Sequence, residues 1–82
     1  MFSKSYCPYC QYTKDLFNNM SVNAKVIELN QVDNGDEIQR ALQVISGQRT
    51  VPNVFVKGQH LGGNDDTQAA ARNGKLKQML EK

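Results

Sequence analysis

The stretch Ser3-Lys4-Ser5-Tyr6-Cys7-Pro8-Tyr9-Cys10 holds both cysteines of this 82-residue chain. A disulfide between cysteines two residues apart would close too short a loop to stabilise a small fold, so a structural staple is a poor explanation. Pro8 is favoured in the first turn of a helix, where its missing N–H costs no hydrogen bond. The stretch therefore predicts a strand end, a turn and a helix that begins at a redox-active pair of thiols.

Cys7 is placed where this helix should start, and free backbone N–H groups together with the helix dipole favour a negative sulfur there. The thiolate is the nucleophilic form of cysteine, so this position suits an attacking thiol. Lys4 adds a positive charge three residues earlier. Cys10 follows one turn later on the same side of the helix and is expected to be less exposed. We predict that Cys7 attacks a disulfide and that Cys10 resolves the mixed disulfide that forms.

The rest of the chain alternates between strand and helix patterns. The predicted strands cover residues 2–5, 24–29, 51–56 and 59–61, and the predicted helices cover residues 9–20, 36–46 and 64–80, the last divided at Gly74. In the second helix, Leu42 and Ile45 fall on one apolar face. A strand–helix–strand start implies a parallel crossover, and the later hairpin adds an antiparallel pair. The order β-α-β-α-β-β-α predicts one α/β domain over residues 1–82, with a mixed four-stranded sheet flanked by helices in the thioredoxin-like arrangement.

The composition excludes several classes of function. The net charge of +2 is spread along the chain, without the basic stripe of a nucleic-acid-binding protein. Apolar runs are too short to cross a bilayer, and no leader pattern opens the chain, so we expect no membrane contact. Half of a tetrahedral zinc site would fit the cysteine spacing, but only His60 remains as a further ligand of the usual type, so we expect no metal and give His60 no role. A reduced thiol pair fits the cytoplasm, or an organelle if a targeting peptide was removed.

A second segment, Thr50-Val51-Pro52, follows the cysteines by about forty residues, at the start of a predicted strand. Pro52 cannot donate to a sheet ladder, so it belongs at a strand end or edge. A trans Val51–Pro52 bond is the default expectation for such a pair. Its combination with the two cysteines reverses that expectation, and a cis bond would turn the Val51 backbone outward to pair with an extended peptide.

The chain resembles a dithiol glutaredoxin of the thioredoxin-like superfamily over nearly its whole length. Two cysteines separated by two residues are a weak signal alone. Their combination, in order and spacing, with Gly47-Gln48-Arg49-Thr50-Val51-Pro52 and Gly62-Gly63-Asn64-Asp65-Asp66 is highly specific. The Pro-Tyr pair between the cysteines, with no preceding Trp, points away from thioredoxin proper. Only six residues precede Cys7, so the first strand is shorter than is usual in the family, and we expect reduced stability.

The resemblance implies a monomeric glutathione-dependent thiol–disulfide oxidoreductase, with glutathione as co-substrate and no tightly bound cofactor. Lys4 and Gln48, with Arg49 as a further candidate, would hold the glycine carboxylate of glutathione. The Val51 backbone would pair with its cysteinyl unit. The helix start at Asn64 would take the γ-glutamyl carboxylate. The implied glutathione site consists of Lys4, Tyr9, Gln48, Thr50, Val51, Pro52, Gly63, Asn64, Asp65 and Asp66.

The implied partners are glutathionylated or disulfide-bearing proteins, with glutathione reductase and NADPH acting indirectly. Cys7 alone would serve protein–glutathione mixed disulfides, whereas protein disulfides would need Cys10 as well. Other interpretations stay open. Asp65 and Asp66 are also ordinary helix caps, and Lys4 an ordinary surface lysine. At the level of the whole protein, the alternatives are a thioredoxin-type reductant, an iron–sulfur cluster shared by two chains through Cys7 and glutathione, or an inert domain.

Overall fold

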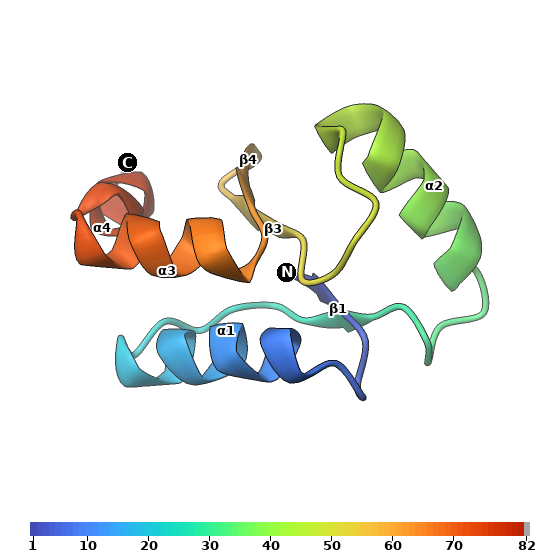
Figure 1. The fold of residues 1–82 in the computed structure, drawn as a ribbon, viewed down its shortest axis with the longest axis horizontal. Helices are drawn as coiled ribbons and strands as arrows, with labels where there is room; N and C mark the ends of the chain where they lie inside the picture. The colour runs from blue at the N-terminus through green and yellow to red at the C-terminus, as the bar shows by residue number, and fades with distance from the viewer. Residues whose placement is uncertain (82) are drawn as a thin grey trace.

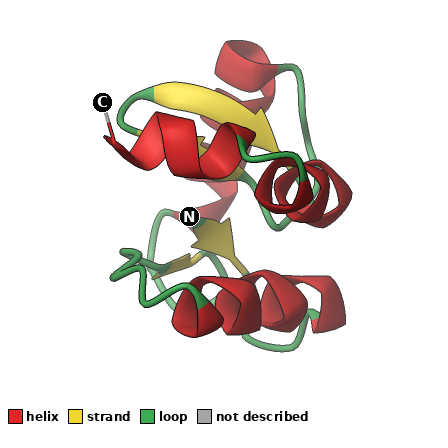
Figure 2. Cartoon of the chain, turned by 90° about the vertical axis from the view of Figure 1, so that its left-hand side faces the viewer, coloured by secondary structure: helices red, strands yellow, loops and turns green. Residues whose placement is uncertain are grey.

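The strands lie between the helices in the computed structural model, which describes residues 1–81 (Figures 1 and 2). In chain order the elements are β1 (Phe2–Ser3), α1 (Pro8–Asn19), β2 (Ile27–Glu28), α2 (Gly35–Ser46), β3 (Val54–Val56), β4 (Gln59–Gly62), α3 (Asn64–Arg72) and α4 (Lys75–Glu81). The predicted order is confirmed, and the last helical region is two helices separated at Gly74. Among residues 1–81, no helix is long and apolar enough to span a membrane.

The four strands form two ladders of two strands each. Phe2 and Ser3 of β1 pair in parallel with β2, while β3 pairs with β4 in the antiparallel direction. A single antiparallel bridge between Phe2 and Asn53 joins the ladders, with N···O distances of 2.8 and 2.9 Å. Because β1 has only two residues, it reaches the start of β3 through this one bridge. The predicted mixed sheet is therefore present as two joined halves.

Three strands are shorter than the sequence predicts. The predicted strands cover residues 2–5, 24–29 and 51–56, but the structure confines them to Phe2–Ser3, Ile27–Glu28 and Val54–Val56. A residue counts as strand only where a partner strand accepts and donates its hydrogen bonds. Two-residue β1 offers β2 little to pair with, and Pro52 has no N–H to donate. The segment before β3 is thus a loop, which is where the second sequence motif lies.

The main core lies between the helices α1, α3 and α4 and the β3–β4 hairpin. It consists of the buried side chains of Phe17, Val54, Val56, Ala70, Leu76 and Met79. Helix α2 lies apart from this core in Figure 1, and it buries Leu42 but leaves Ile45 73% exposed. Leu42 and Ile45 lie one turn apart on α2, but too little of the protein packs against this helix to cover both residues.

Candidate active site

Cys7 caps the N-terminus of α1. Its backbone is extended, with φ −90° and ψ 117°, and its Sγ accepts a hydrogen bond from the backbone N–H of Cys10 at 3.3 Å. Pro8 occupies the first helical turn, as the sequence predicted. The cap satisfies one of the free N–H groups at the helix start, and the same groups stabilise a negative sulfur. The structure therefore places Cys7 where an attacking thiolate is favoured.

The loop before β3 lies against this sulfur. The Cys7 thiol donates to the carbonyl oxygen of Val51 at 3.8 Å, and the Val51–Pro52 peptide bond is cis, as expected from the combination of the two motifs. Residues 44 positions apart in the chain are thus in contact. The contact brings the Thr50–Pro52 segment to the reacting atom, where it can bind whatever is attached to that atom.

Cys10 has a different environment from Cys7. Both cysteines are free thiols, but the Cys10 side chain has no exposed surface, whereas Cys7 is partly exposed. Burial, reinforced by the hydrogen bond and charge of Cys7, raises the pKa of the Cys10 thiol above its usual range, and contacts with Ser3 and Lys4 offset only part of this rise. A buried and protonated thiol is a poor nucleophile towards an outside disulfide. The predicted division of labour, with Cys7 attacking and Cys10 resolving, agrees with this geometry.

The raised pKa of Cys10 gives the resolving step a pH dependence. When Cys7 is held in a mixed disulfide, its own contributions are lost, but burial, the largest cause, remains. Below its pKa, the thiolate fraction of Cys10 rises about tenfold per pH unit, so resolution should accelerate about a hundredfold between about pH 6 and pH 8. Thionitrobenzoate release from a Cys7–thionitrobenzoate disulfide, followed by stopped-flow absorbance, measures this rate. Cys10→Ser should release none, and a pH-independent rate would contradict the assignment.

A groove of about 450 Å³ opens beside this loop. Its lining contains nine of the ten residues predicted for the glutathione site, namely Tyr9, Gln48, Thr50, Val51, Pro52, Gly63, Asn64, Asp65 and Asp66. Helix α3 begins here with Gly63 as its N-cap, and no side chain caps its first N–H groups. Asp65 and Asp66 lie in the first turn of α3, where their charges also favour the helix dipole. Two carboxylates and an uncapped helix start lie at this end of the groove.

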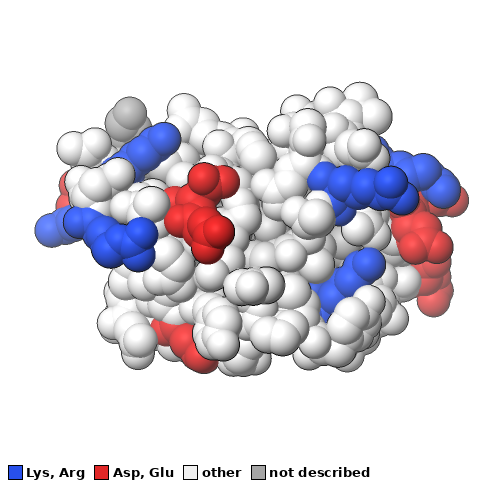
Figure 3. Space-filling model, viewed as in Figure 1, with Lys and Arg blue, Asp and Glu red and all other residues white. Residues whose placement is uncertain are grey.

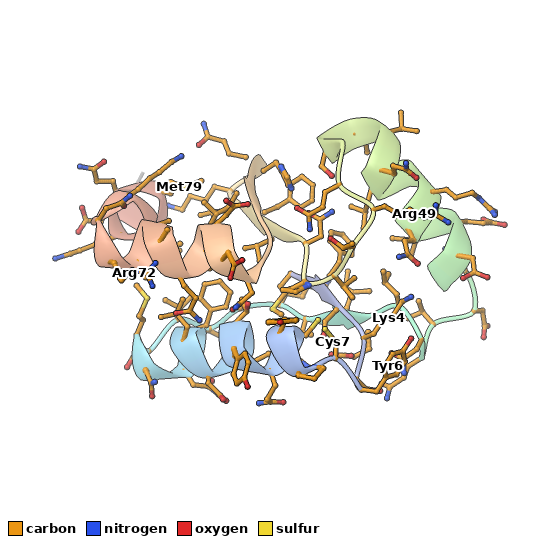
Figure 4. The ribbon with its side chains drawn as sticks, viewed as in Figure 1. Lys4, Tyr6, Cys7, Arg49, Arg72 and Met79 are labelled. Atoms are coloured by element: carbon orange, nitrogen blue, oxygen red, sulfur yellow. The ribbon has the colours of Figure 1, made fainter. Side chains whose placement is uncertain are left out.

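A second hollow of about 470 Å³ continues from Thr50 and Val51 in the other direction. It is lined by Cys7 and by the tenth predicted residue, Lys4, together with Arg49 and Gln39. Figure 4 shows Lys4 and Arg49 on the same side of Cys7, towards α2. In Figure 3 basic side chains lie at both ends of this face, over α2 and over α4, and acidic side chains lie over the start of α3 and at the edge beside α2. Within residues 1–81, neither Lys4 nor Arg49 forms an ion pair.

Gln39 was not predicted as a site residue. It lies on α2, and its Nε2 donates to the carbonyl oxygen of Arg49 at 2.8 Å, so it orients the backbone at the basic end. A single glutamine on the polar side of a helix carries no distinctive pattern. Only the docking of α2 beside residues 48–51 gives it a place in the site.

Two predicted residues direct their side chains into the protein. The amide of Asn64 accepts hydrogen bonds from Thr13 Oγ1 at 2.9 Å and Gln68 Nε2 at 3.2 Å, which ties the start of α3 to α1. Gln48 Nε2 donates to two backbone carbonyls of the active-site loop. Their side chains therefore hold the walls of the groove together.

His60 lies in the hairpin and takes no part in the site. Its Nε2 lies 2.9 Å from Asn53 Oδ1, and its ring packs against Phe55 with 5.1 Å between centroids. Across residues 1–81, no group of three or more His, Cys, Asp or Glu side chains is arranged to hold a metal ion.

The site combines a thiol at a helix N-cap, a buried second thiol one turn later and a cis-proline loop. On a thioredoxin-like fold, these features define a thiol–disulfide oxidoreductase. The family model named Glutaredoxin matches residues 1–61. The chain belongs to the glutaredoxin family, and it is a thiol–disulfide oxidoreductase.

Similar proteins cover nearly all of the chain. Glutaredoxin-C6 of Oryza sativa subsp. japonica is 50% identical over 80 residues, spanning 98% of this chain and 71% of the relative. Glutaredoxin-C8 of the same species is 51% identical over 82 residues, spanning 98% and 60%. Among solved structures, a buckwheat glutaredoxin–glutathione complex superposes with a TM-score of 0.94 at 50% identity, covering 98% of this chain and 73% of that one. Wheat glutaredoxin superposes with a TM-score of 0.93 at 52% identity, covering 98% of this chain and 76% of that one.

Proposed function

We propose that this protein is a glutathione-dependent oxidoreductase that reduces protein–glutathione mixed disulfides through Cys7 alone and protein disulfides through Cys7 and Cys10. The observation that carries the proposal is the charge pattern about the attacking sulfur. Lys4 and Arg49 line a hollow on one side of the Thr50–Val51 backbone, and Asp65 and Asp66 line a groove on the other. Glutathione is an extended tripeptide with a carboxylate at one end and both an ammonium and a carboxylate at the other.

At the basic end, Lys4 and Arg49 would bind the glycine carboxylate. Neither is used in an ion pair within residues 1–81, so both charges are available to a ligand. A charge-assisted hydrogen bond to a carboxylate is roughly twice as strong as a neutral one. Gln39 would support this end by holding the Arg49 carbonyl.

In the middle, the Val51 backbone would pair with the cysteinyl unit of glutathione. Its carbonyl oxygen lies 3.8 Å from Cys7 Sγ, so a peptide bonded to this segment has its sulfur next to Cys7. Such pairing is a short strand addition, in which main-chain hydrogen bonds provide the affinity.

At the acidic end, the first N–H groups of α3 would bind the γ-glutamyl carboxylate, and Asp65 or Asp66 its ammonium group. The absence of a side-chain cap at Gly63, among the described residues, leaves these N–H groups open to an anion. The buckwheat relative, 50% identical, was solved as a complex with glutathione, which favours this placement.

The reaction would proceed in two exchanges. The Cys7 thiolate attacks the glutathione sulfur of the mixed disulfide, a Cys7–glutathione bond forms, and the substrate thiol leaves as a thiolate that takes up a proton. A second glutathione thiolate then attacks the same glutathione sulfur, which releases Cys7 and gives glutathione disulfide. Glutathione reductase and NADPH would return the disulfide to glutathione. For a protein disulfide, Cys10 would instead attack Cys7 and expel the reduced substrate.

Cys10→Ser tests this proposal, because it separates the two routes. The variant should reduce a glutathionylated peptide at close to the wild-type rate, in an assay coupled to glutathione reductase and NADPH. With a protein disulfide as substrate, it should instead accumulate a stable mixed disulfide at Cys7, detectable by mass spectrometry. Loss of activity on both substrates would mean that the glutathione exchange also needs Cys10, and the one-cysteine route would be wrong.

A further inference from the structure

We propose that Gln48 is a positioning residue of the glutathione site, whose side-chain amide holds the Thr50–Pro52 loop in its binding conformation without contacting glutathione. This inference rests on the proposed function and reassigns one residue of it. The sequence placed Gln48 among the ligands of the glycine carboxylate. The hydrogen bonds of the structure give it a different task.

The side-chain amide of Gln48 donates both of its hydrogens to the loop. Its Nε2 donates to the carbonyl oxygen of Thr50 at 2.9 Å and to that of Pro52 at 2.8 Å. An amide nitrogen carries two hydrogens, so both are engaged. Only Oε1 remains, and an acceptor does not bind a carboxylate. The glycine carboxylate is therefore left to Lys4 and Arg49.

The two bonded carbonyls flank Val51. With Thr50 and Pro52 held on either side, the Val51 backbone between them is fixed beside Cys7, where its carbonyl oxygen lies 3.8 Å from Sγ. A loop fixed before the ligand arrives loses less conformational entropy on binding. The two hydrogen bonds from Gln48 therefore fix the segment that would pair with the cysteinyl unit of glutathione.

Gln48 is itself anchored to α2. Its backbone N–H donates to Ser46 Oγ at 3.1 Å, and that hydroxyl donates to the Leu42 carbonyl at 2.6 Å. The buried Asn53 also donates to Ser46 Oγ, at 3.3 Å. Hydrogen bonds to its backbone therefore tie Gln48 to the last turn of α2, and its side-chain amide connects that turn to the loop.

The same amide borders the acidic half of the groove. A Cβ added at Gly63 would lie 3.7 Å from Gln48 Nε2 and 3.6 Å from the Pro52 carbonyl oxygen. The turn that leads into α3 thus packs directly on the Thr50–Pro52 loop that Gln48 holds. Movement of the loop would shift both halves of the site relative to each other, so the effect of losing the amide should appear in the binding of the whole tripeptide.

The test uses Cys10→Ser protein, in which Cys7 exchanges with oxidised glutathione to give Cys7–glutathione and one free glutathione. Gln48→Ala and Gln48→Glu are added to this background, because the glutamate keeps the size of the side chain and removes both donors at neutral pH. We expect each to lower the equilibrium constant of this exchange about tenfold, as expected for two lost hydrogen bonds. Mass spectrometry of quenched mixtures measures it. Gln59→Ala, an exposed glutamine in β4, is the matched control and should change nothing.

Exchange with hydroxyethyl disulfide distinguishes positioning from general damage. This reagent forms the same bond to Cys7 but carries no tripeptide, so its equilibrium should be the same in all variants. An equal loss with both disulfides, or an unchanged glutathione equilibrium in Gln48→Glu, would overturn the inference alone. If the Cys10→Ser parent itself showed no preference for glutathione over hydroxyethyl disulfide, the proposed function would fall and the inference with it.

Discussion

Replacing Cys7 by serine is expected to abolish reduction of every disulfide substrate, with a loss of at least about 10³-fold in kcat/KM. A serine hydroxyl is not ionised at neutral pH, and among residues 1–81 the hollow beside Cys7 is lined by no His, Asp or Glu side chain that could activate it. Both proposed routes begin with attack by the Cys7 sulfur, so kcat/KM should fall for every disulfide substrate. The glutathione reductase-coupled assay, with a glutathionylated peptide and with a protein disulfide, measures the effect.

Cys10→Ser is the matched control for this prediction, since it removes the other thiol of the pair by the same change. Cys10 cannot take over from Cys7, because its side chain has no exposed surface and burial raises the pKa of its thiol. Appreciable activity of Cys7→Ser on either substrate would show that Cys10 reaches an outside disulfide, and would refute the assigned roles.

Replacing Gly35 by alanine is expected to destabilise the fold strongly, by about 3 kcal/mol. Gly35 is the buried first residue of α2, and an added Cβ would collide with the backbone carbonyl of Leu29, 2.8 Å from its carbon and closer still to its oxygen. Alanine would favour the helix by up to about 1 kcal/mol, but this gain is smaller than the cost of moving a strand end and a helix start apart. Thermal unfolding should show a fall in Tm of more than about 10 °C.

Gly47→Asn provides the comparison for Gly35→Ala. Gly47 ends the same helix in the left-handed conformation, with φ 75° and no atom within 4 Å of an added Cβ. Asparagine tolerates this conformation, so the change should cost less than about 1 kcal/mol. Equal losses in the two variants would mean that α2 is sensitive to any change at its ends, and the proposed collision would not be the cause.

The functional residues nearest to Cys7 in the chain were predictable, because their chemistry depends on local geometry. The N-cap position of Cys7, the first-turn Pro8 and the covered position of Cys10 all follow from where a helix begins and how its residues repeat. The cis bond before Pro52 was expected only when two distant motifs were read together. The family assignment had the same basis, since three short segments in fixed order are far more specific than any one of them.

Other features depended on contacts that a local pattern does not contain. The apolar positions of α2 do not show how much of the helix is covered, and Ile45 is exposed because little of the protein packs against that helix. Gln48 lines the groove, but the sequence did not predict that its amide donates to two backbone carbonyls of the loop, since a glutamine amide donates as well to a backbone carbonyl as to a carboxylate. Gln39 was missed because only the position of α2 brings it to Arg49.

By itself, the sequence determined the order of the elements and the position of the two thiols at a helix start, and it predicted the division of labour between Cys7 and Cys10. These properties follow from helix periodicity and from the free N–H groups of a helix start, which act over a few residues. Only the tertiary structure decided how the basic side chains, the cis-proline loop and the start of α3 meet around one sulfur. Their arrangement depends on hydrogen bonds and packing between segments tens of residues apart, and no spacing in the chain specifies those contacts.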